Sequence, residues 1–165
     1  DTDVELLRPF GDLLELSGFA GFEDAEHVAT CVLGAEKEHG FFRQAMELYE
    51  GRTFLREGGE PDLTTNVEIL TGLLGRNGLE PDGARQSVMG MEIFPAEYFS
   101  PRSLETGKLT KTGNTYAIHW FEASWQTGSQ RFHRKVAQVI GKKNTERLKK
   151  LLGRPGGPES SGRSG

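Results

Sequence analysis

Two aspartates at the start of the chain have the type and spacing of a divalent-metal site. Asp1 and Asp3 are separated by one residue, and side chains at positions i and i+2 of an extended segment point the same way. Two such carboxylates suit Mg²⁺ or Mn²⁺, which accept oxygen ligands and bridge to substrate phosphates. Because the Asp-x-Asp pattern also occurs by chance in surface turns, its interpretation depends on the rest of the chain.

A second group of polar residues, from Asp62 to Asn66, precedes a predicted helix. Thr65 and Glu68 have the spacing of a capping box, in which each side chain accepts a hydrogen bond from the other residue's backbone N–H. Asn77-Gly78 is expected to end this helix, because both residues tolerate positive φ. The group therefore has a structural role at a helix N-terminus, whatever else it does.

Hydrophobic spacing predicts the elements that would position these residues. A helix over about 41–50 has Phe42, Met46 and Tyr49 on one face. The segment 4–16 has leucines at near-helical spacing, broken into short pieces by a proline and a glycine. Strand-forming residues are concentrated in four segments, Phe19–Phe22, Val28–Leu33, 88–94 and 115–121. The alternation of predicted strands and helices favours an α/β layer structure.

Charge is distributed unevenly along the 165 residues. The formal net charge of -4 combines -13 over residues 1–100 with +9 over residues 101–165. Most of the positive charge lies in 131–150, where an apolar stripe predicts a basic amphipathic helix over 129–152. Such a helix either packs on the domain with a solvated basic face or contacts an anionic membrane peripherally. Nucleic acid is not expected as a partner, because the body of the chain is acidic and has no binding motif.

Composition predicts one globular domain followed by two C-terminal segments. Residues 1–128 form the predicted catalytic domain, 129–152 the basic helix, and 153–165 a disordered tail rich in glycine, proline and serine. Cys31, in an apolar stretch, is expected to be a buried packing residue and not a nucleophile. No apolar run approaches the roughly 20 residues that span a bilayer, so a cytoplasmic or peripherally membrane-bound protein is expected.

The first seven residues, Asp1-Thr2-Asp3-Val4-Glu5-Leu6-Leu7, resemble the Asp-x-Asp segment of glycosyltransferase family 32, which includes capsular polysaccharide transferases and yeast-type mannosyltransferases. Further similar blocks follow in the family's order, at Val32–His39, Asp62–Asn66, Ile93–Pro101, Thr115–Trp120 and Ser124-Trp125. The resemblance extends over about residues 1–126. It implies an α/β fold of the glycosyltransferase A type, of which the chain would be the C-terminal part, without the strands that bind the nucleotide.

The resemblance also implies roles at the metal site. Asp3 would bind the metal directly, Asp1 would contact the metal, its waters or the ribose, and His119 would be a second protein ligand. Imidazole favours Mn²⁺ over Mg²⁺, so Mn²⁺ (or Mg²⁺) is the expected cofactor. The alternative for His119 is a strand histidine whose nitrogens are satisfied by hydrogen bonds. Trp120, which follows it, is expected to lie in the core.

Two further sets of residues receive expected roles from the same resemblance. Ser124 and Trp125 would donate hydrogen bonds to the diphosphate leaving group, with core packing as the alternative for the tryptophan. The donor sugar and the acceptor would be bound by Asp62, Thr64, Thr65 and Asn66. Asp3, Asp62 and Asn66 are therefore the predicted catalytic residues.

The expected function is that of a retaining glycosyltransferase. It would move a hexose from a nucleoside-diphosphate sugar, a UDP- or GDP-hexose, to a glycan or lipid-linked acceptor. One alternative is a truncated domain of the same fold that does not catalyse transfer. Another is a phosphatase of the haloacid dehalogenase type, which also begins its site with Asp-x-Asp. The phosphatase is disfavoured, because Glu5 stands where that family has Thr or Val, and its downstream Gly-Asp-x-x-x-Asp motif is absent.

Overall fold

The computed structural model describes residues 2–121, which contain both helices and sheets. Contacts group Asp1–Leu104 with Lys108–Glu122 in one compact unit, which holds all the elements named below. The predicted basic helix over 129–152 and the predicted tail over 153–165 lie outside the described residues. No helix within residues 2–121 has the length and apolar character needed to cross a membrane.

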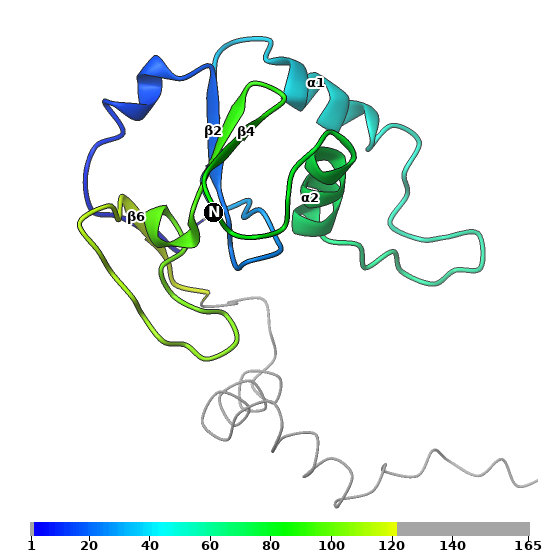
Figure 1. Ribbon diagram of the computed structural model, residues 1–165. Coiled ribbons are helices and arrows are strands. Elements are labelled where there is room, and N and C mark those ends of the chain that lie inside the picture. The colour runs from blue at the N-terminus through cyan, green and yellow to red at the C-terminus, as the bar shows by residue number, and fades with distance from the viewer. Residues whose placement is uncertain (1, 122–165) are drawn as a thin grey trace, which may run out of the picture. The chain divides into compact units, whose positions relative to one another are not determined.

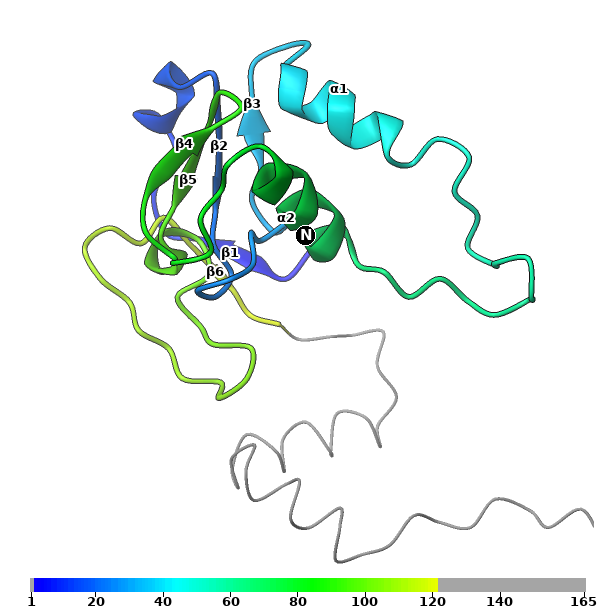
Figure 2. The same cartoon turned by 45° about the vertical axis from the view of Figure 1, so that its right-hand side comes forward.

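A mixed four-stranded sheet is at the centre of the unit (Figures 1 and 2). Its strands are β2 (Gly18–Gly21), β3 (Gly34–Ala35), β4 (Gln86–Val88) and β5 (Met91–Phe94), in the order β3-β2-β5-β4. The pair β2–β5 is parallel, with Ala20 opposite Ile93, and the two outer pairs are antiparallel. The strand predicted at Phe19–Phe22 is therefore confirmed as β2, one residue earlier.

The strand predicted at 88–94 is confirmed for Met91–Phe94, which form β5, but it is not continuous, because the chain reverses at Met89 and Gly90 near its start. Met89 and Gly90 have φ values of 54° and 78°, and β4 and β5 pair across them with Val88 opposite Met91. Two central residues with positive φ make the kind of two-residue turn whose twist matches that of antiparallel strands. A methionine at such a position is unusual, so hydrophobic periodicity alone did not reveal the turn.

The strand predicted at Val28–Leu33 is also wrong. Val28 forms an isolated bridge with Phe22, and the Ala29 N–H donates to the Gly21 carbonyl at 2.8 Å, but regular pairing resumes only at β3. Val28 and Ala29 are both buried, whereas a strand with one solvated face alternates. Cys31 is buried in this irregular segment, which confirms its interpretation as a packing residue, and its burial raises the pKa of the thiol.

Two helices follow one another between β3 and β4, so strands and helices do not alternate as the sequence suggested. Helix α1 (Gly40–Glu47) confirms the helix predicted at 41–50, and α2 (Asn66–Arg76) begins with the predicted capping box. The Glu68 N–H donates to the Thr65 hydroxyl at 3.2 Å, and Glu68 Oε2 accepts from the Thr65 N–H at 2.7 Å. Beyond α2, Gly78 has a φ of 100°.

Two apolar clusters pack on opposite faces of the sheet, because neighbouring strand residues point in opposite directions. Ala20 and Ile93 belong to the cluster that includes the buried residues of α1 and α2. Phe19 and Phe94 belong to the other cluster, with Leu13 of the 3₁₀ turn η1 (Leu13–Glu15) and several aromatic residues. Figures 1 and 2 show α1 and α2 on one side of the sheet and η1 on the other.

A separate two-stranded antiparallel sheet joins β1 (Val4–Leu6) to β6 (Ala117–His119). The start of segment 4–16 is thus a strand, where the leucine spacing had indicated short helical pieces, and its partner β6 confirms the strand predicted within 115–121. In this register Val4 lies opposite His119. The pairing brings Val4–Leu6 next to Ala117–His119, more than a hundred residues further along the chain.

Candidate metal and sugar-binding site

The β1–β6 pairing places Asp3 beside His119. Asp3 immediately precedes β1, and its carbonyl accepts a hydrogen bond from the Trp120 N–H at 2.9 Å. Its carboxylate Oδ1 lies 3.3 Å from His119 Nε2. Two of the three predicted metal ligands are therefore side by side; the third, Asp1, lies outside the described residues.

Burial determines the protonation state of this pair. The side chains of His119 and Asp3 are only 12% and 20% exposed, and the ring of Phe121 lies 3.9 Å from the imidazole, measured between centroids. Loss of hydration lowers the pKa of His119 below its ordinary value, although the carboxylate of Asp3 acts in the opposite direction. At neutral pH the imidazole is thus uncharged, which is the form that binds a metal ion.

The chemistry of this donor set fits a divalent cation in part. A carboxylate oxygen and a neutral imidazole suit Mn²⁺, but within residues 2–121 no group of three or more His, Cys, Asp or Glu side chains is arranged to hold a metal. Mg²⁺ and related ions commonly combine one or two protein carboxylates with substrate phosphates and water. A metal ion held by Asp3 and His119 would therefore need further ligands from phosphates or water.

Three side chains around this pair were not predicted from the sequence. The indole N–H of Trp120 donates to Glu5 Oε2 at 3.0 Å, and the guanidinium of Arg102 bonds to the Trp120 carbonyl and lies 5.4 Å from the centre of its ring. Trp120 is half-buried, so its expected place in the core is wrong. Glu5 lies two residues after Asp3, as Asp3 lies two residues after Asp1, so this spacing could have indicated Glu5 from the sequence. No feature of the neighbouring sequence indicates Arg102.

Asp62 anchors the loop before α2. Its carboxylate accepts hydrogen bonds from Arg52 at 2.7 Å and Arg56 at 3.0 Å, and from the Thr64 hydroxyl at 2.7 Å. The Thr64 hydroxyl bond and then the Arg56 guanidinium hold the pKa of Asp62 well below its ordinary value. A carboxylate this strongly bound stays ionised, so it is unsuited to donating a proton and suited to fixing the loop.

The remaining predicted residues continue from Asp62 into α2. Thr65 is the N-cap, and Asn66 Oδ1 accepts a hydrogen bond from the Tyr49 hydroxyl at 2.9 Å. Within residues 2–121, none of the hydrogen bonds made by Asp62, Thr64, Thr65 and Asn66 reaches the metal-site pair. The structure thus divides the predicted catalytic residues between two groups, with Asp3 in one and Asp62 and Asn66 in the other.

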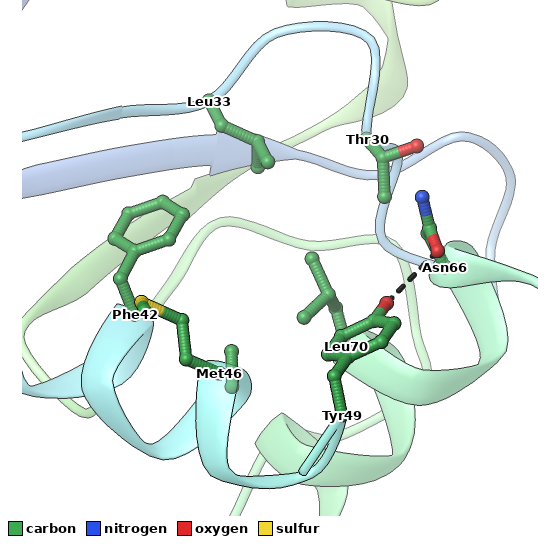
Figure 3. A pocket seen from close by; sticks show the side chains of 8 residues that line it. Thr30, Leu33, Phe42, Met46, Tyr49, Asn66 and Leu70 are labelled. Atoms are coloured by element: carbon green, nitrogen blue, oxygen red, sulfur yellow. Dashed lines mark hydrogen bonds between the residues drawn. The ribbon is translucent and has the colours of Figure 1, made fainter. Parts of the chain in front are cut away.

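Asn66 also lines an open pocket of about 320 Å³ between α1, α2 and the segment before β3 (Figure 3). The predicted helix face of Phe42, Met46 and Tyr49 lines the same pocket. Phe42 is partly buried against the core cluster that contains Phe41 and Ala45, whereas Met46 and Tyr49 are exposed. The predicted diphosphate ligands Ser124 and Trp125 lie outside the described residues.

Comparisons of the chain with models of protein families, with curated proteins and with solved structures gave no match.

Proposed function

We propose that this chain carries the metal-binding side of a retaining glycosyltransferase with a glycosyltransferase A-type fold. It transfers a hexose from a UDP- or GDP-sugar to a glycan or lipid-linked acceptor. The observation that carries the proposal is the approach of Asp3 to His119 within 3.3 Å, made by strands from the two ends of the family resemblance. The mixed α and β structure and the neutral state of His119 support it.

In this proposal Asp3 and His119 hold Mn²⁺ (or Mg²⁺), with Asp1 as a further ligand. When bound, the metal neutralises charge on the departing diphosphate and orients it. Asp3 supplies the negative charge that attracts the cation, and His119 supplies a nitrogen that needs no deprotonation at neutral pH. Arg102 is bonded to the carbonyl of Trp120, the residue after His119, and guanidinium groups bind phosphate oxygens well.

The second group has a different part in the proposal. Asp62 keeps the loop in shape through its two arginine contacts. Thr64, Thr65 and Asn66 present hydroxyl and amide groups for the hydroxyls of the donor sugar or the acceptor. Ser124 and Trp125, which lie outside the described residues, would donate to the diphosphate, and the basic segment 131–150 would either pack on the domain or contact a membrane peripherally.

Calorimetric titration of UDP and of GDP, with and without Mn²⁺, tests this function. We expect at least one nucleotide to bind at least about tenfold more tightly with Mn²⁺, and Asp3→Asn to remove this enhancement. Asp24→Asn is the matched control, because Asp24 also pairs with a histidine but lies outside the proposed site. An enhancement that survives in Asp3→Asn, or that is absent from the wild type, would refute the proposal. Enhancement without sugar transfer would indicate the non-catalytic alternative.

A further inference from the structure

The pocket beside α1 has two chemically different ends. Figure 3 shows Thr30, Asn66 and the Tyr49 hydroxyl at one end and Phe42, Leu33 and Met46 toward the other. Leu70 forms part of the lining between them. The volume of about 320 Å³ lies within the range of small-molecule sites. A ligand that fills the pocket therefore meets hydrogen-bonding groups at one end and carbon and sulfur atoms along the rest of its length.

The polar end is organised by a hydrogen bond within the protein. The Tyr49 hydroxyl donates to Asn66 Oδ1 at 2.9 Å, which orients the carboxamide. Figure 3 shows the amide nitrogen of Asn66 directed away from Tyr49, on the side where Thr30 lies. The carboxamide thus presents N–H donors, and the Tyr49 hydroxyl presents acceptor lone pairs; Figure 3 shows the Thr30 methyl group, not its hydroxyl, on the pocket side. Such a set suits one or two hydroxyl groups of a ligand.

The apolar end is exposed to a degree that needs an explanation. Met46 is 71% exposed and Leu33 is 36% exposed. Exposed apolar side chains that gather around a hollow commonly mark a binding site. Methionine adapts its shape to aliphatic ligands better than branched residues do.

We infer that this pocket binds an amphiphile, with its aliphatic chain along Leu33, Phe42 and Met46 and its hydroxyl-bearing head against Tyr49 and Asn66. A free sugar fits less well, because its hydroxyls surround the ring, whereas the polar groups of the pocket lie at one end. The inference does not require the metal site. If the proposed glycosyltransferase function also holds, an amphiphile-binding pocket favours the lipid-linked acceptor over the plain glycan.

Alkyl glucosides of increasing chain length, each used below its micelle concentration, test the inference. We expect methyl glucoside not to bind measurably, and affinity to rise by roughly two- to fourfold for each added CH₂ until the pocket is filled. The side-chain amide resonances of Asn66 should shift with the same titration curve. Binding should be unchanged in Asp3→Asn, which separates this outcome from the fate of the metal site. Methyl glucoside binding as tightly as octyl glucoside would overturn the inference.

Two variants locate the binding, and a third controls for them. Met46→Lys is expected to weaken octyl glucoside binding at least about tenfold by placing a charge against the chain. Tyr49→Phe should weaken it by roughly three- to tenfold by removing one hydrogen-bonding group. Leu63→Lys, at an apolar residue that is 75% exposed and does not line this pocket, should have no effect. Equal binding by Met46→Lys and the wild type, with both folded by circular dichroism, would refute the assignment.

Discussion

His27 and His119 each lie beside an aspartate, yet the two pairs are built in opposite ways. His27 Nδ1 is 3.0 Å from Asp24 Oδ1, within one turn of chain, and the two side chains are 42% and 56% exposed. His119 Nε2 is 3.3 Å from Asp3 Oδ1, across a two-stranded sheet, and those side chains are 12% and 20% exposed. The same two residue types thus occur once as a local surface contact and once as a long-range, largely buried one.

The difference changes the charge of the imidazole. The hydrogen bond that His27 donates to Asp24 raises the pKa of His27, whereas burial lowers the pKa of His119 despite its neighbouring carboxylate. His27 therefore keeps its proton to a higher pH than a free histidine does, and His119 loses its proton at a lower pH. A protonated imidazole cannot bind a metal. A carboxylate beside a histidine is consequently not enough to define a metal site, because the degree of burial determines which pair is available.

The largest expected effect is on metal affinity. His119→Gln should weaken Mn²⁺ binding by at least about tenfold, because it removes a proposed ligand. Mutating a residue that only hydrogen-bonds to a metal ligand already weakens metal binding by about 10- to 100-fold. His27→Gln should leave Mn²⁺ binding unchanged. Electron paramagnetic resonance of free Mn²⁺ measures the Mn²⁺ affinity of each variant. Equal losses in the two variants would erase the proposed distinction between the pairs.

A second contrast is expected in stability. His119→Ala removes a largely buried ring that contacts Phe121 and should lower the free energy of unfolding by about 1–2 kcal/mol. His27→Ala removes an exposed contact and should change it by less than about 0.5 kcal/mol. Urea unfolding followed by circular dichroism gives both values. A larger loss for His27→Ala would show that the local pair supports the fold more than its exposure indicates.

The pH dependence of stability should have opposite signs for the two histidines. The folded pKa of His119 is below its unfolded value, so its contribution is complete above about 6.5 and is lost as the pH falls toward the folded pKa. The folded pKa of His27 is above its unfolded value, so its contribution is present below about 6.5 and is lost as the pH rises through the folded pKa. Unfolding of wild type, His119→Gln and His27→Gln across pH 5–8 should show each slope disappear with its own histidine.

The smallest expected effect is a shift in the pKa of each histidine when its aspartate is neutralised. Asp24→Asn should bring the pKa of His27 down toward its ordinary value, because the carboxylate is the main cause of the rise. Asp3→Asn should lower the pKa of His119 further, because the Asp3 carboxylate, which raises this pKa, is removed while the burial that lowers it remains. NMR titration of the two imidazoles measures the shifts. A rise at His119 in Asp3→Asn would contradict the role assigned to burial.

Elements with strong local signals were predicted correctly. The capping box of Thr65 and Glu68, and the α2 helix that follows it, depend on residues within a few positions of one another. The errors arose where backbone turns and strand pairing, which composition does not reveal, decided the outcome. Residues 88–94 fold back on themselves at Met89-Gly90, and the segment after Val28 leaves the sheet, although both have the composition of a strand.

The same division applies to the candidate site. The types of its residues, an aspartate before a strand and a histidine in another, are properties of the sequence, and so was the expectation that both bind a metal. Their separation of 3.3 Å follows from the pairing of β1 with β6. The neutral state of His119 and the contacts of Arg102 with Trp120 depend on which side chains surround them after folding. Loss of hydration and cross-strand distance arise only when the chain folds, so the tertiary structure decided that His119 and His27 should differ.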